Sequence, residues 1–321
     1  MGAIQVAKTL VEEQTGKLFG ELWTHYDEEL FQQSVALFEK RWVGNGEDPE
    51  FFRGKHCLDV GCGGGRFCIA MAKMGAHSVK GVDVSPTGLE DARMRVAREG
   101  LSNVSFQEAS ALILPFDDNQ FDFVCCSGVL HHTAGVERGL REIYRVLKPG
   151  GSVYLLLYGA GGLFWPSNYV LRSYAGLLGQ EALRRSAAAA EYPPNKRKSV
   201  LDDLFVPILE TYTGDRVAQL LRDSGFPQWR TWETARMDHE GDAGAMLGEM
   251  ETRLRLWEAA ESTGSDQAAS VVARHGVDLC KSVIQAIQGL IDLNQAGRIS
   301  EQELRDAVIG HGHHRLIATR A

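Results

Sequence analysis

The stretch Cys57-Leu58-Asp59-Val60-Gly61-Cys62-Gly63-Gly64-Gly65-Arg66 decides the fold of this 321-residue chain. Its first part predicts a buried strand, its glycines a tight turn, and residues 66–74 a helix. Glycine permits positive φ and leaves no side chain between the main chain and a ligand, so the N-terminus of the helix is accessible. The stretch therefore predicts a turn that binds a ligand with a polar tail.

Two kinds of nucleotide-like cofactor bind such turns, and the neighbouring residues distinguish them. A dinucleotide-binding turn has the pattern G-x-G-x-x-G, but Arg66 occupies its third glycine position here. Asp59 stands at the carboxyl end of the expected strand, where its carboxylate can pair with a cationic group. S-Adenosylmethionine carries such an ammonium group, so the pattern favours this cofactor over NAD.

The segment from Asp59 to Arg66 resembles motif I of the class I S-adenosylmethionine-dependent methyltransferases. The resemblance continues in family order through Val79–Ser85, Leu114–Phe116, Phe121–Val124, Val129–His132 and Leu147–Gly151. It implies a Rossmann-like α/β fold: a doubly wound, seven-stranded, mostly parallel sheet with N-terminal helices and helical insertions. Tyr158-Gly159 and the L-H-H-T stretch are similar to a bacterial small-molecule subgroup.

The core pattern alternates strands and helices, as in a parallel sheet covered on both faces. Strands are expected at 56–60, 79–83, 104–107, 121–126, 152–158 and 229–237, and helices at 66–74, 86–99 and 135–147. A last strand at 314–319 is expected to return antiparallel into the sheet.

The resemblance also implies the residues that hold the cofactor. Asp83 would accept both ribose hydroxyls; the alternative is an acidic flank for the helix that begins near Pro86. Relatives often have an acidic residue for the adenine amine where this chain has Ser110, a weaker acceptor, and Glu108 lies close enough to substitute. The expected cofactor-binding residues are Asp59, Gly61, Cys62, Gly63, Asp83, Val84, Ser110, Ala111 and Ser127.

The acceptor side is expected beyond the fourth strand. His131 is the candidate general base, because an imidazole of near-neutral pKa can take a proton from a hydroxyl or amine; in many relatives it only shapes the pocket. By the same resemblance, the substrate-side candidates are His132, Tyr158, Trp165, Asp203 and Tyr212. Ordinary packing and capping explain these residues at least as well.

Helical periodicity and aromatic residues characterise the N-terminal segment 5–42. It either packs on the core or forms a lid over the cofactor. The expected organisation is an N-terminal helical lid (1–50), a cofactor-binding core (51–159), a substrate-side helical insertion (160–212), a continuation of the core (213–237), a second helical insertion (238–310) and the final core strand (311–321).

Composition limits the substrates and the compartment. A formal net charge of −8 gives no overall attraction to nucleic acid, so small neutral or cationic acceptors are favoured. The six cysteines include no C-x-x-C pair and are expected to be reduced and mostly buried. The sequence begins with neither a leader pattern nor a long apolar stretch, which predicts a cytoplasmic protein without membrane association.

Two local patterns suggest metal ions. Residues 292–303 overlay a calcium loop but lack the fifth-position oxygen; a helix–turn–helix with a stop at Gly297 and a capping box at 300–303 is the favoured alternative. The histidines of 311–314 have no supporting ligand pattern. We therefore expect no metal site.

The sequence as a whole predicts an enzyme that transfers a methyl group from S-adenosylmethionine to an O, N or S atom of a small molecule, leaving S-adenosyl-L-homocysteine. Methylation of tRNA or protein is the alternative activity, and a non-catalytic cofactor-binding scaffold the alternative class. No nucleic-acid partner is expected, and the helical additions are candidates for a homodimer contact.

Overall fold

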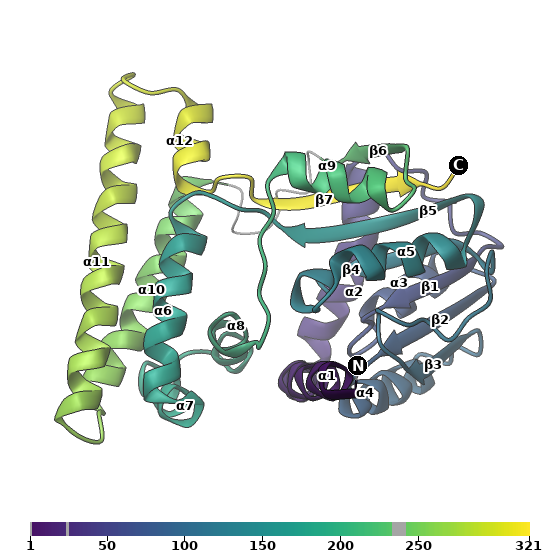
Figure 1. Cartoon of the computed structure of the whole chain (residues 1–321). Helices are drawn as coiled ribbons and strands as arrows, with labels where there is room; N and C mark the ends of the chain where they lie inside the picture. The colour runs from purple at the N-terminus through teal and green to yellow at the C-terminus, as the bar shows by residue number, and fades with distance from the viewer. Residues whose placement is uncertain (1, 24–25, 233–241) are drawn as a thin grey trace. The chain divides into compact units, whose positions relative to one another are not determined.

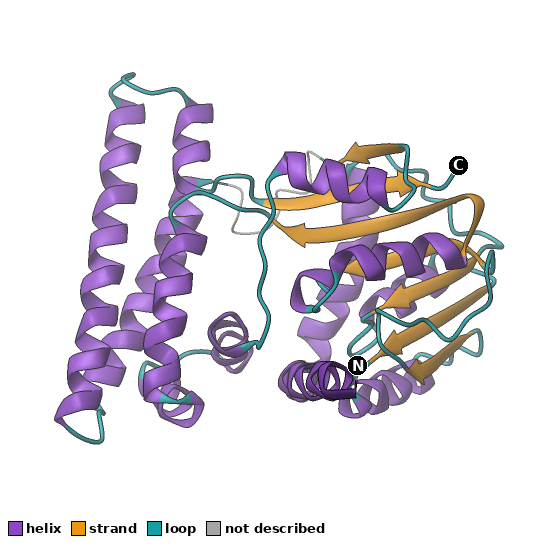
Figure 2. Cartoon of the chain, in the orientation of Figure 1, coloured by secondary structure: helices purple, strands orange, loops and turns teal. Residues whose placement is uncertain are grey.

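A computed structural model describes residues 2–23, 26–232 and 242–321, and it divides the chain into two compact units (Figure 1). Unit 1 contains residues 1–158, 207–235 and 313–321; unit 2 contains 159–206 and 236–312. The chain therefore passes from one unit to the other four times. In the described part of the chain every strand belongs to unit 1, and unit 2 is helical (Figure 2).

Unit 1 contains a seven-stranded sheet in the order β3-β2-β1-β4-β5-β7-β6. Its strands are β1 (His56–Val60), β2 (Ser78–Asp83), β3 (Val104–Glu108), β4 (Phe121–Ser127), β5 (Leu147–Tyr158), β6 (Gln228–Thr231) and β7 (His313–Thr319). The first five pair in parallel, while β7 is antiparallel to both β5 and β6. The expected fold class and the antiparallel last strand are thus confirmed. Residues 233–237 of the expected sixth strand lie outside the described residues.

Helices cover both faces of this sheet. They are α1 (Gly2–Trp23), α2 (Glu28–Gly44), α3 (Arg66–Lys73), α4 (Pro86–Arg98), the 3₁₀ turn η1 (Leu130–His132), α5 (Val136–Val146) and α9 (Gly214–Asp223). Strand β1 shows why two faces form: Leu58 and Val60 belong to a core with α5 and α9, whereas Cys57, which precedes Leu58, belongs to a core with α2, α3 and α4. Successive side chains of a strand point to opposite faces, so an almost continuous apolar strand needs helices on both.

Unit 2 consists of α6 (Phe164–Leu178), α7 (Gln180–Ala189), α8 (Pro194–Phe205), α10 (Ala243–Ser262), α11 (Gln267–Gln295) and α12 (Glu301–Val308). Helix α11 packs along α10 and α6. Gly276 of α11 lies against the Trp257 ring of α10, where an added Cβ would come within 2.3 Å of the ring. The two inserted segments thus share one helical core.

The turn between α11 and α12 settles the reading of residues 292–303. Helix α11 continues through Asp292, Gly297 follows it with φ of 67°, and Ser300 and Glu303 form a reciprocal capping box at the start of α12. The helix–turn–helix alternative is therefore confirmed.

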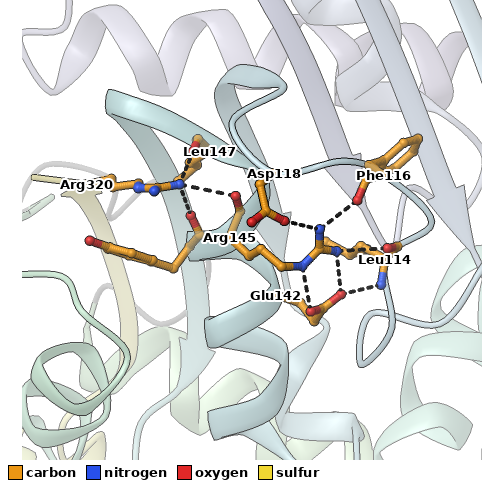
Figure 3. A network of polar contacts seen from close by, with 8 residues as sticks. Leu114, Phe116, Asp118, Glu142, Arg145, Leu147 and Arg320 are labelled. Atoms are coloured by element: carbon orange, nitrogen blue, oxygen red, sulfur yellow. Dashed lines mark hydrogen bonds and ion pairs between the residues drawn. The ribbon is translucent and has the colours of Figure 1, made fainter.

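A guanidinium network fixes the loop that follows the expected adenine segment (Figure 3). Arg145 of α5 donates to the carbonyl oxygens of Leu114 and Phe116 at 3.0 and 2.7 Å and bonds to Asp118 and Glu142. The Glu142 carboxylate also accepts the Leu114 N–H at 2.7 Å. One planar cation therefore orients the loop through several bonds in fixed directions.

Arg145→Lys is expected to lower the free energy of unfolding by about 1–3 kcal/mol, because a lysine ammonium cannot reproduce the forked set of hydrogen bonds. Urea unfolding measures this loss. Arg141→Lys, at an exposed position of the same helix, is the matched control and should change little. Equal stabilities of the two variants would contradict the anchoring role.

Candidate active site

The glycine turn forms where β1 ends and α3 begins. Gly61 has a φ of 71°, and its N–H and that of Cys62 donate to the carbonyl oxygen of Val82 at the end of β2. A Cβ built at Gly61 would lie 2.3 Å from a methyl group of Val129, so neither the conformation nor the space admits a side chain. The turn therefore presents bare main chain at the carboxyl end of the sheet.

Asp83 is the carboxylate that holds this turn against β2. One oxygen accepts the N–H of Gly63 at 2.8 Å, and the other accepts the N–H of Ser85 at 2.8 Å. Burial raises the pKa of the Asp83 carboxyl, while the backbone hydrogen bonds act in the opposite direction. A carboxylate has about four lone-pair positions, so this orientation leaves acceptor capacity for a diol.

Asp59 is enclosed near the carboxyl end of β1. Its side chain is 1% exposed, and one oxygen accepts a bond from the Cys68 thiol at 3.4 Å. Burial raises the pKa of the Asp59 carboxyl from its ordinary 3.8 to about 7, although Cys68 and Arg66 partly counter this. Pairing with the ammonium group of a ligand stays a prediction.

The segment after β3 contacts the N-terminal helix α1. The Ser110 hydroxyl accepts the Leu112 N–H at 3.0 Å and donates to the Glu12 carboxylate of α1 at 2.5 Å. Ala111, the next residue after Ser110, is buried. The main chain of Val84 packs against α1 at Gly16. The predicted adenine segment is thus in contact with the N-terminal helix.

Three aromatic rings stack beyond the end of β4, whose last residue is Ser127. The rings of His131 and Tyr158 are 3.8 Å apart at 29°, and His313 stacks on the far side of Tyr158 at 4.5 Å. His131 is fully buried, and neither of its ring nitrogens has a hydrogen-bond partner among the described residues. Burial, with His132 and His313 nearby, holds the pKa of His131 well below its ordinary 6.5, so the ring is neutral.

The segment 208–212, the end of the expected substrate-side insertion, runs beside these rings. The His132 ring forms a hydrogen bond with the carbonyl oxygen of Ile208. The N–H of Glu210 donates to the carbonyl oxygen of His131. The Tyr212 N–H donates to the Tyr158 carbonyl oxygen, and the Tyr212 hydroxyl donates to the Glu210 carboxylate at 2.5 Å. Main-chain bonds thus fix the His131 region.

The remaining two predicted residues belong to unit 2. The Trp165 ring packs 5.0 Å from that of Phe164. The Asp203 carboxylate pairs at 2.6 Å with Arg253, which is 1% exposed and also donates to the Asn168 side chain. Asp203 therefore compensates a buried charge inside unit 2. Acceptor contacts by either residue stay predictions, and Arg253 carries no sequence signal that reveals its burial.

Comparison with known proteins identifies the family. The methyltransferase-domain model Methyltransf_11 matches residues 58–155. A ubiquinone biosynthesis O-methyltransferase of Chelativorans sp. is 32% identical over 186 residues, which are 53% of this chain and 72% of that protein. The chain belongs to the class I S-adenosylmethionine-dependent methyltransferases. The glycine turn, Asp59 and Asp83 lie within the residues that the family model covers.

Two further similarities agree with this assignment. A demethylmenaquinone methyltransferase of Symbiobacterium thermophilum is 38% identical over 144 residues, 44% of this chain and 57% of that protein. The chain thus spans less than two thirds of this relative. A Haemonchus contortus phosphoethanolamine N-methyltransferase structure shares the fold, with a TM-score of 0.50, 19% identity, and coverage of 95% of this chain and 57% of that one.

The residues of this methyltransferase fit the family's cofactor, S-adenosylmethionine. Gly61 leaves bare main chain at the turn, packed against Val129, and Asp83 has two oriented oxygens at the adjacent strand end. Strand order reverses between β1 and β4, and open α/β sheets bind ligands at this switch point. Within the described ranges, no helix combines the length and apolar character needed to cross a membrane.

Proposed function

We propose that this methyltransferase transfers a methyl group to an O, N or S atom of a small-molecule acceptor, with His131 as the proton acceptor. The observation that carries the proposal is the neutral, fully buried His131 ring, whose two nitrogens have no hydrogen-bond partner among the described residues. This ring lies at the same edge of the sheet as the glycine turn. A buried polar group without a partner is costly unless a ligand satisfies it.

The chain's residues have separable tasks in this proposal. When bound, S-adenosylmethionine supplies a methyl group on a positively charged sulfur. Asp83 and the glycine turn hold its nucleoside and amino acid parts, and His131 takes the proton that the acceptor atom loses. Alignment of acceptor and methyl group supplies much of the remaining rate enhancement.

The acceptor that we propose to test first is a phenolic or quinol ring. The relatives named above are a demethylmenaquinone methyltransferase and an O-methyltransferase of ubiquinone biosynthesis, and the His131 region is rich in aromatic rings. The net charge of −8 disfavours a nucleic-acid acceptor.

Turnover with a panel of acceptors tests this function. Purified protein is incubated with S-adenosylmethionine labelled in the methyl group and with catechols, quinols, amines or thiols, and release of S-adenosyl-L-homocysteine is measured. Label in a small molecule supports the proposal. Label in added tRNA or protein would replace it by the macromolecular alternative, and cofactor binding without any turnover would favour a scaffold.

Asp83→Asn is expected to weaken cofactor binding about 10- to 150-fold, because the amide loses charge-assisted hydrogen bonds to the ribose. Calorimetry with S-adenosyl-L-homocysteine measures the change. Asp117→Asn removes the same charge at an exposed position and should leave the affinity unchanged. Unchanged affinity of Asp83→Asn would remove this residue from the site.

A further inference from the structure

One face of α1 lies along the strand ends that form the expected nucleoside site. Glu12, Gly16 and Gly20 are spaced four residues apart and so share that face. A Cβ at Gly16 would lie 2.9 Å from the Val84 carbonyl oxygen, and one at Gly20 would lie 2.0 Å from the Ser85 hydroxyl. The missing side chains let the helix main chain contact the residues that directly follow Asp83.

Glu12, on the same face of α1, contacts the segment after β3. Its carboxylate accepts the hydrogen of the Ser110 hydroxyl at 2.5 Å, which is the single hydrogen bond that the structure describes for it. The Ser110 oxygen already accepts the Leu112 N–H. The hydroxyl therefore has no hydrogen left to donate, while the carboxylate keeps most of its acceptor positions.

The Glu12–Ser110 pair is therefore an acceptor-only surface. It lies next to Asp83, because the N–H of Ala109 donates to the Asp83 carbonyl oxygen at 3.0 Å. A nucleoside whose ribose binds the Asp83 carboxylate has its base within reach of this neighbouring strand end. An exocyclic amino group, with two hydrogens to donate, complements the carboxylate, whereas a carbonyl oxygen in its place meets repulsion.

We propose that Glu12 determines the specificity for the base of the cofactor, by accepting a hydrogen bond from the 6-amino group of adenine. This inference rests on the proposed function and assigns to α1 the carboxylate that Ser110 lacks. The N-terminal helix then takes part in cofactor recognition as well as in packing. The sequence separation of Glu12 and Ser110 hides this pairing, which only the fold brings together.

A pair of ligands that differ at one position of the base tests the proposal. S-Adenosyl-L-homocysteine carries the 6-amino group, and S-inosyl-L-homocysteine carries a carbonyl oxygen there. Calorimetry is expected to show at least about tenfold tighter binding of the adenosyl compound by the unmodified protein. In Glu12→Gln the ratio is expected to fall to about threefold or less, because an amide can also donate to the carbonyl oxygen.

Glu13→Gln is the matched control, since it removes the same charge from the next, exposed position of the helix. Its ratio should equal that of the unmodified protein. Equal weakening of both ligands in Glu12→Gln would show a covering helix without base recognition and would overturn the proposal. If the unmodified protein binds neither ligand, the proposed cofactor function itself fails.

Discussion

Asp59→Asn is expected to stabilise the cofactor-free protein at pH 8 by up to about 4 kcal/mol. The reason is that burial raises the pKa of this carboxyl from 3.8 to about 7, so above pH 7 the folded protein contains a buried charge. Below pH 7 the folded protein holds Asp59 protonated while the unfolded chain stays ionised. The stability cost therefore shrinks by about 1.4 kcal/mol per pH unit and is gone below pH 4.

Urea unfolding of both proteins at pH 8, 7, 6 and 5 measures this difference. The exposed Asp223→Asn serves as control and should show no comparable pH-dependent gain. A stability difference that is constant with pH would contradict the raised pKa.

Cofactor binding by the same variant tests the predicted ammonium contact. If Asp59 pairs with the ammonium group, Asp59→Asn binds S-adenosyl-L-homocysteine more weakly at pH 8, and binding by the unmodified protein weakens as the pH falls below 7. Both follow because only the ionised carboxylate attracts the cation. Equal affinities at pH 8 would leave Asp59 with a purely structural role beside Cys68.

His131→Phe is expected to lower turnover about 10²- to 10⁴-fold while changing cofactor affinity less than threefold. The phenyl ring retains the stack on Tyr158 but cannot accept a proton. Because the pKa of His131 lies well below 6.5, the imidazole is already neutral at pH 6. Turnover should therefore show no loss between pH 8 and pH 6 from protonation of this group.

Turnover assays of His131→Phe and of His77→Phe, which changes an exposed histidine just before β2, provide the comparison. The second variant should retain full activity. Full activity in His131→Phe would assign His131 to packing, and catalysis would then depend on alignment of the acceptor.

Much of the fold could be predicted because local patterns and long-range packing agree. The buried strand before Gly61 and the glycines after it specify one local geometry, and the three helices expected at 66–74, 86–99 and 135–147 lie within about two residues of their observed bounds. The last strand could be predicted because Leu316, Ile317 and Ala318 give the segment 314–319 an apolar centre that fits the sheet of the other strands.

The candidate site was harder to predict where it depends on pairing of distant segments. In the sequence Glu12 is an ordinary polar residue of a helix. Only its hydrogen bond to Ser110 connects it with the candidate site. In the sequence His313 is one of a group of histidines without a ligand pattern. The register of β7 with β5 places it beside Tyr158, where the two rings stack. The pairing of Asp203 with the buried Arg253 could not be predicted, because an ion pair between distant residues produces no periodic pattern in the sequence.

The position of β7 between β5 and β6 has a consequence for the order of folding. Tyr158 and His313 are adjacent in the sheet, yet all of unit 2 separates them along the chain. Contacts between such distant residues form late, because closing the intervening loop costs entropy until that loop is itself compact. We therefore expect the helical insertion to become structured first, and its collapse to bring together the two ends that complete the sheet.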